Sequence, residues 1–132
     1  MAAVRDLWVT YENVKKKPLI DLYSDEIIVK NKLSIDHFIP WSYVVNDELW
    51  NLIPMDKSFN SSKGNRLPNW DNFFLRLVRA QFELCTSIFE SEEIQKKFEA
   101  CKNFNLYFTW AQEELYRREN DQDKFLQFWI II

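Results

Sequence analysis

One glycine, Gly64, and only four prolines occur in the 132 residues of this chain. Glycine supplies the left-handed backbone of tight turns, and glycine and proline together are the strongest local signals for turns and loops. A chain this poor in both residues is expected to contain few tight turns and few long loops. Helix is therefore the favoured structure over most of the sequence.

Apolar residues make up 47% of the chain and aromatic residues 17%, which is typical of a folded globular protein. The length fits one domain with a modest core, and we expect residues 1–132 to form a single domain. No signal peptide opens the sequence and no apolar run reaches the ~18 residues of a membrane helix, so we expect a cytoplasmic protein without a membrane segment. The last five residues are all apolar, which indicates either a buried last element or a piece of a longer protein.

The net charge of -3 is not that of a strongly basic nucleic-acid-binding protein, but the charge is unevenly distributed. Residues 1–80 carry 11 Lys and Arg against 10 Asp and Glu, a net charge of +1, whereas residues 81–132 carry 6 against 10, a net charge of -4. If the protein meets DNA or RNA, the first part of the chain is expected to face it.

The two cysteines, Cys85 and Cys101, are sixteen residues apart in a region with helical periodicity. A structural zinc site needs about four ligands, and the chain has no CxxC pair and only one histidine. We therefore expect no structural zinc, and we expect both cysteines to be core residues.

Helical periodicity is present at both ends of the chain. Apolar residues from Val4 to Val14 predict a first helix within residues 1–18. Its end carries lysines at 15–17, which can be either a solvated helix end or a phosphate contact. In the second half, Asn69 or Asp71 can cap a long amphipathic helix. Further helices are expected at 92–102, 106–118 and 123–132, so residues 71–132 form a helical extension.

Between the helical ends, residues 19–70 have the pattern of short strands followed by a short helix. β-Branched residues favour strands, residues 30–32 favour a turn, and Gly64 is a natural helix stop. The fold class that follows is α+β. The expected elements are short strands at 27–29 and 33–35, a strand at 49–55 and a short helix at 56–64.

Asp36 and His37 are adjacent, and His37 is the only histidine of the chain. Three further polar residues follow it at short range: Asn51, Asn60 and Lys63. An acid beside a base, followed by amides and a cation, suits the hydrolysis of a phosphodiester with one bound metal ion. On its own, a single histidine is more often a core or surface residue with a satisfied hydrogen bond.

The chemistry assigns a role to each residue. A hard ion such as Mg²⁺ or Mn²⁺ takes one or two oxygen ligands from protein, which the Asp36 carboxylate and the Asn60 carbonyl can supply. Histidine has an ordinary pKa of about 6.5 and is largely neutral at pH 7, so His37 can act as general base. Lys63 lies one helical turn from Asn60 and can contact the phosphate.

Two geometric conditions follow from the local structure. Alternation along a strand puts Asp36 and His37 on opposite faces, so both serve one site only if the strand ends or bends there. Asn51 lies near the start of the second strand, where its amide can brace the loop that carries His37. Asp56, four residues before Asn60, is an additional candidate ligand.

These residues resemble the HNH endonuclease family, most closely the subgroup that includes the HNH domain of CRISPR RNA-guided nucleases. The resemblance implies a ββα-metal motif with His37 as general base, Asp36 and Asn60 as metal ligands, and Asn51 as a structural brace. It also implies DNA as substrate, with 5′-phosphate and 3′-hydroxyl ends as products. The motifs that carry it are DHFIPWS at 36–42, DELWNLIP at 47–54, NSSK at 60–63 and LP at 67–68.

Alternatives remain open at this point. The chain can be a catalytically inactive HNH-like module that binds nucleic acid or protein, or the nuclease part of a larger defence or mobile-element protein. Trp41, Trp50 and Trp70 can stack on bases, but at this density of aromatic residues tryptophan is more often part of the core.

Overall fold

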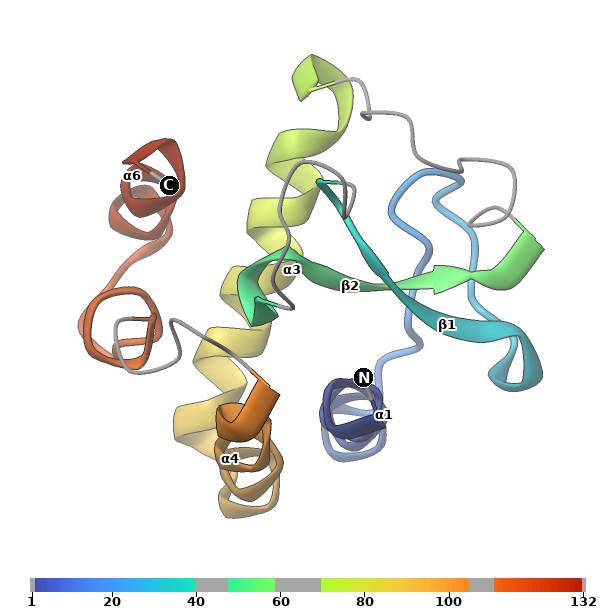
Figure 1. Cartoon of the computed structure of the whole chain (residues 1–132), viewed down its shortest axis with the longest axis horizontal. Helices are drawn as coiled ribbons and strands as arrows, with labels where there is room; N and C mark the ends of the chain where they lie inside the picture. The colour runs from blue at the N-terminus through green and yellow to red at the C-terminus, as the bar shows by residue number, and fades with distance from the viewer. Residues whose placement is uncertain (1, 40–47, 59–69, 105–110, 132) are drawn as a thin grey trace.

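The computed structural model describes residues 2–39, 48–58, 70–104 and 111–131 of the chain. This part is mostly helical, with one two-stranded antiparallel sheet (Figure 1), and it confirms the predicted α+β class. The helices are α1 (Ala2–Lys15), α3 (Trp70–Glu90), α4 (Glu92–Glu99) and α6 (Gln122–Ile131), the strands are β1 (Leu33–His37) and β2 (Leu52–Asp56), and the short turns are η1 (Lys30–Lys32), η2 (Leu49–Asn51), η3 (Ala100–Phe104) and η4 (Ala111–Leu115).

Helix α1 forms where the sequence predicts a first helix. Its apolar residues recur at helical spacing and face the core. The helix ends at Lys15, because Lys16 has a φ of 54°, a left-handed conformation that stops an α-helix. Near the start of α1, Arg5 donates a 2.7 Å hydrogen bond to the carbonyl of Leu33 and so ties the helix to β1. The buried residues of α1 are Val4, Leu7, Trp8, Thr10 and Tyr11.

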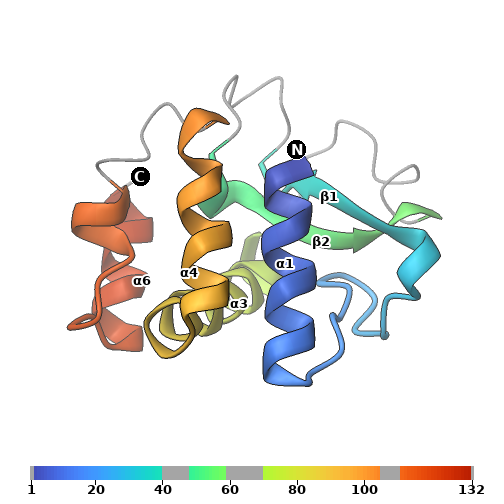
Figure 2. The same ribbon diagram turned by 90° about the horizontal axis from the view of Figure 1, so that it is seen from below.

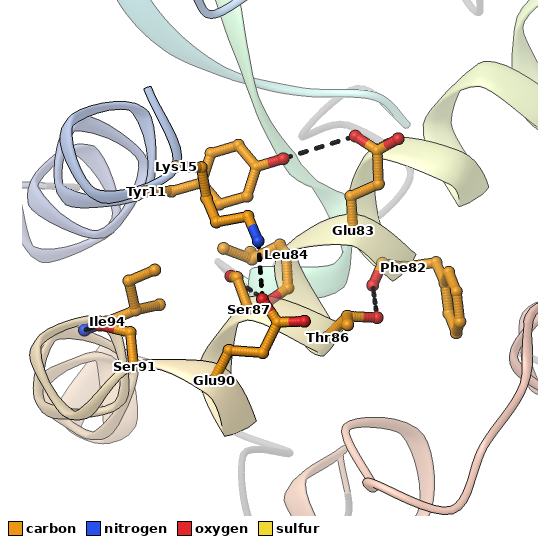
Figure 3. A network of polar contacts seen from close by, with 10 residues as sticks. All are labelled: Tyr11, Lys15, Phe82, Glu83, Leu84, Thr86, Ser87, Glu90, Ser91 and Ile94. Carbon is orange, nitrogen blue, oxygen red and sulfur yellow. Dashed lines mark hydrogen bonds and ion pairs between the residues drawn. The ribbon is translucent and has the colours of Figure 1, made fainter. Parts of the chain in front are cut away.

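Helix α1 is also attached to α3 by two polar contacts (Figure 3). The Tyr11 hydroxyl donates to Glu83 at 3.4 Å, and the Lys15 Nζ atom lies 2.6 Å from Glu90. Figure 2 shows α1 and α4 side by side, and α1 packs against both α4 and α3. The three helices therefore form one packed unit beside the hairpin.

Helices α3 and α4 are separated by a single residue, Ser91. The Ser91 hydroxyl caps α4 by accepting a hydrogen bond from the amide of Ile94 at 3.3 Å. Acidic residues in the first turn of α4 and lysines in its last turn add favourable interactions with the helix dipole. The long amphipathic helix predicted to start at Asn69 or Asp71 begins at Trp70.

Strands β1 and β2 pair in antiparallel register, from Leu33 opposite Asp56 to His37 opposite Leu52. Four residues of β2, from Leu52 to Met55, are buried, whereas β1 is buried only at Leu33. The strand predicted at 49–55 is thus wrong at its start, because η2 forms a 3₁₀ turn before β2 begins. The structure extends the predicted strand at 33–35 to His37.

The strand predicted at 27–29 is also wrong. In this region the backbone makes one isolated bridge, between Ile20 and Ile27. The side chains of Ile27 and Val29 are 64% and 57% exposed. The high strand propensity of β-branched residues reflects packing against covered neighbours, and these two side chains lack that cover.

The helical predictions for the last third are largely confirmed. The helix predicted at 92–102 is α4 followed by the 3₁₀ turn η3, and the last helix is α6. For the helix predicted at 106–118, the described residues contain only the π-helical turn η4. The short helix predicted at 56–64 starts at residue 57, but residues 59–64 lie outside the described part of the chain. None of the described helices combines the length and apolar character needed to cross a membrane.

Candidate active site

Asp36 and His37 are the last two residues of β1, and the chain bends immediately after them at residues 38 and 39. Both side chains are partly buried, opposite Ile53 and Leu52 of β2. The strand thus ends at His37. Because side chains alternate along a strand, Asp36 and His37 can serve one site only where the strand ends or bends, and this condition is met.

Asn51 fixes the bend that follows His37. Its side-chain Oδ1 accepts a hydrogen bond from the amide of Ile39 at 2.7 Å, and its Nδ2 donates to the carbonyl of the same residue at 2.9 Å. The Asn51 carbonyl also accepts from the amide of Phe38 at 2.8 Å. Asn51 is fully buried, and its three hydrogen bonds are compatible with the brace expected from the sequence.

Tyr23 is a neighbour of Asp36 that the sequence analysis missed. Burial raises the pKa of its hydroxyl well above the usual value, and the nearby charges of Asp36 and Asp21 raise it further. Its ring stacks on Phe38, with ring centroids 6.3 Å apart, and meets the edge of Phe73 at 4.9 Å. The site therefore contains a neutral phenol beside Asp36, held between two aromatic rings.

The loop that carries Tyr23 is organised by Asp21, a carboxylate that is 1% exposed. Its Oδ1 accepts hydrogen bonds from the amides of Tyr23 and Ser24 at 2.8 and 2.9 Å. Its Oδ2 accepts from the amide of Asp56 at 2.8 Å. A buried carboxylate is stable only with such donors, and here they connect the loop to the end of β2. No motif marks Asp21 in the sequence, so only its contacts identify it.

Asp56 is the last residue of β2 and directly precedes the helical residues 57 and 58. Its Oδ1 accepts a 2.8 Å hydrogen bond from the amide of Ser58, which makes Asp56 the cap of the short helix. This hydrogen bond uses one carboxylate oxygen of Asp56, the residue named from the sequence as an additional candidate ligand. Asn60 and Lys63 lie outside the described residues, so their positions relative to Asp36 are not part of the described site.

The described residues fit a divalent ion in part. Asp36 offers a carboxylate at a strand end, and a Mg²⁺ ion takes as few as one or two ligands from protein. Within residues 2–39, 48–58, 70–104 and 111–131, no group of three or more His, Cys, Asp or Glu side chains is placed to hold a metal.

The two cysteines are core residues, as the sequence predicts. Burial raises the pKa of both thiols to about 12, so both stay protonated at neutral pH. The Sγ of Cys85 lies 3.9 Å from the carbonyl of Arg117, and the Sγ of Cys101 lies 3.4 Å from the carbonyl of Lys97. Cys85 lies in α3 and Cys101 lies in η3.

Comparison with known protein families gives a match for one segment of the chain. Neither a curated protein nor a solved structure matches the sequence. Residues 21–69, which run from the Asp21 loop through both strands, match a family model described as HNH endonuclease. This match supports an HNH endonuclease domain built on the hairpin that carries Asp36 and His37.

Proposed function

We propose that the protein is a metal-dependent endonuclease that hydrolyses DNA phosphodiester bonds, with His37 as general base. The observation that carries the proposal is the strand end at His37, followed by a bend that the buried Asn51 fixes through three hydrogen bonds. The match of residues 21–69 to the HNH endonuclease family supports the same reaction class.

In this proposal His37 removes a proton from the attacking water as the new bond to phosphorus forms. The bond between phosphorus and the 3′-oxygen breaks, and the products carry a 5′-phosphate and a 3′-hydroxyl. A Mg²⁺ or Mn²⁺ ion held by Asp36 and Asn60 supplies Lewis-acid stabilisation of the phosphate oxygens when bound. Lys63 contacts the phosphate, and the neutral phenol of Tyr23 lies beside the carboxylate of Asp36.

The resemblance of the motifs at 36–42, 47–54, 60–63 and 67–68 supports the finer placement in the subgroup that includes the HNH domain of CRISPR RNA-guided nucleases. We propose DNA rather than RNA as the substrate on the same resemblance. The nuclease also suits a role as one part of a larger defence or mobile-element protein, in which target recognition comes from another segment or another chain.

The test is a plasmid-nicking assay with Mg²⁺ or Mn²⁺ that compares the wild type with His37→Ala. Removal of a general base lowers the rate by about 10²- to 10⁴-fold. Ser34→Ala is a matched control, because Ser34 lies on the same strand and bonds to the carbonyl of Met55 at the other end of the pairing. Equal nicking by wild type and His37→Ala would contradict the assignment of His37.

A second candidate function is a catalytically inactive module that binds nucleic acid or protein. The net charge of -4 over residues 81–132 favours the protein-binding form of this module, because a DNA-binding surface is usually basic. Salt-sensitive DNA binding without nicking in either metal would support this function. Metal-dependent nicking that is lost in His37→Ala would exclude it.

A further inference from the structure

Gln81 is a polar residue at the centre of the buried face of α3. The α3 positions around it, Leu77, Val78, Leu84 and Cys85, are buried and form part of the core. Gln81 is fully buried as well, and a buried amide is unfavourable unless its hydrogen-bonding groups are satisfied. An apolar residue would fit the helical pattern better, so the contacts of the amide must explain its presence.

The Gln81 amide is satisfied by two other parts of the molecule. Its Nε2 donates to the carbonyls of Leu49 and Leu52, both at 3.1 Å. Its Oε1 accepts a 3.0 Å hydrogen bond from the hydroxyl of Tyr116. The Gln81 side chain therefore donates two hydrogen bonds to the backbone just before and at the start of β2. It also accepts one hydrogen bond from the C-terminal third of the chain.

The two carbonyls that Gln81 binds lie on either side of Asn51. All four backbone and side-chain polar groups of Asn51 are already used, because its amide also donates to the carbonyl of Glu48 at 2.9 Å. Asn51 can therefore move only together with the peptide units that flank it. By holding Leu49 and Leu52, Gln81 sets the position of the brace behind His37.

Tyr116, like Gln81, is held in place by several contacts. It follows the π-helical turn η4, and its amide donates to the carbonyl of Ala111 at 2.7 Å. Its ring lies 5.2 Å from that of Phe98 and 6.2 Å from that of Phe125. Burial raises the pKa of its hydroxyl, which keeps it a neutral donor to Gln81. π-Helical turns are often found at functional sites.

We propose that Gln81 and Tyr116 are positioning residues for His37. The hydrogen bonds run from the Tyr116 hydroxyl through the Gln81 amide to the backbone around Asn51, and from Asn51 to the bend at residues 38 and 39. The family match covers the strand end but not the helical extension. In this proposal, two residues of the helical extension thus fix the geometry of the strand end. The inference rests on the proposed function for its effect on rate, but its structural part can be measured without it.

His37 provides the structural readout, because it is the only histidine and gives one ring Cε1–H signal in an untagged protein. We expect Gln81→Leu, which keeps the volume but removes the donors, to shift or broaden this signal. Tyr116→Phe, which removes only the hydroxyl, should shift it less. Ser87→Ala is the control, since Ser87 is also buried on α3 but bonds to Leu84 of its own helix.

The rate readout separates positioning from general loss of stability. We expect kcat for nicking to fall about ten- to a hundredfold in Gln81→Leu and less in Tyr116→Phe, with the KM for DNA little changed. Ile94→Ala removes buried volume from α4 but none of the hydrogen bonds of Gln81, and it controls for stability loss. At a temperature where all variants are folded, its kcat should equal that of the wild type.

Two results would overturn the proposal. A His37 signal that is unchanged in both Gln81→Leu and Tyr116→Phe shows that the network does not reach the strand end. A kcat loss in Ile94→Ala as large as that in Gln81→Leu shows a general stability effect. If Gln81→Leu does not fold, Tyr116→Phe carries both tests. A wild type that does not nick DNA refutes the proposed function, whereas the histidine signal still decides the positioning claim.

Discussion

The hairpin region and the helical region of this protein are held together in different ways. Around the hairpin, buried polar side chains bond to backbone groups far away in the sequence, as Asp21, Asn51 and Gln81 do. Among α1, α3 and α4, the buried residues are mainly apolar, and the described polar contacts between α1 and α3 lie nearer the surface. Hydrogen bonds are directional and apolar contacts are not, so the backbone around the hairpin is held in a more sharply defined geometry than the helical region.

The largest effect that separates the two regions is expected from Asn51→Leu. The change leaves the amide and the carbonyl of Ile39 without the partners described above, which costs about 2–4 kcal/mol of unfolding free energy. Because the bend after His37 loses its brace, the nicking rate should fall about a hundredfold. Urea unfolding and a plasmid-nicking assay measure the two effects, and a variant that nicks at the wild-type rate would contradict the role of the brace.

A second large effect is expected from Asp21→Ala. The amides of Tyr23, Ser24 and Asp56 lose their acceptor, and the stability should fall by about 3 kcal/mol in urea unfolding. Glu26→Ala is the control, since Glu26 lies on the same loop and its side chain is exposed. Equal stability of the two variants would show that the Asp21 contacts do not organise this loop.

The difference between the regions also explains what the sequence could predict. Helices α1, α3 and α6 follow from apolar residues at helical spacing, a local signal. The roles of Asp21 and Gln81 could not be predicted, because the partners that connect them to β2 and the segment before it lie 29 to 35 residues away and nothing near them marks a buried polar residue. The strand expected at 27–29 failed for a related reason, because the side chains of Ile27 and Val29 are not covered.

The residues of the candidate site also divide into those that the sequence predicted and those that it did not. Asp36 and His37 were predicted from their adjacency, and the brace by Asn51 was predicted from its place near the start of the second strand, and their roles in the site stay predictions. Tyr23 was missed, because its proximity to Asp36 depends on a loop that no periodic pattern describes. The assignments of Asn60 and Lys63 stay predictions, since both residues lie outside the described part of the chain.

The apolar nature of the helical region can be tested through its two thiols. Burial raises the pKa of Cys85 and Cys101 from 9.0 to about 12, so above pH 9 the unfolded chain releases protons that the folded chain keeps. This stability is fully present below pH 9 and is lost as the pH rises toward 12, by about 1.4 kcal/mol per thiol and pH unit. Urea unfolding at pH 8, 9 and 10 should show a steeper loss in the wild type than in a Cys85→Ala, Cys101→Ala variant. Parallel losses would show that the thiols are accessible to water.

The smallest effect is expected at the surface of the helical region, where Lys15 meets Glu90 at 2.6 Å with both side chains partly exposed. Exposed ion pairs contribute little, because water screens the charges and two long side chains lose freedom. A double-mutant cycle of Lys15→Ala and Glu90→Ala should therefore give a coupling of about 0.5 kcal/mol, which falls further in high salt. Thermal unfolding at two salt concentrations measures it. A coupling as large as the loss in Asn51→Leu would remove the contrast between the regions, because polar contacts would then hold both of them.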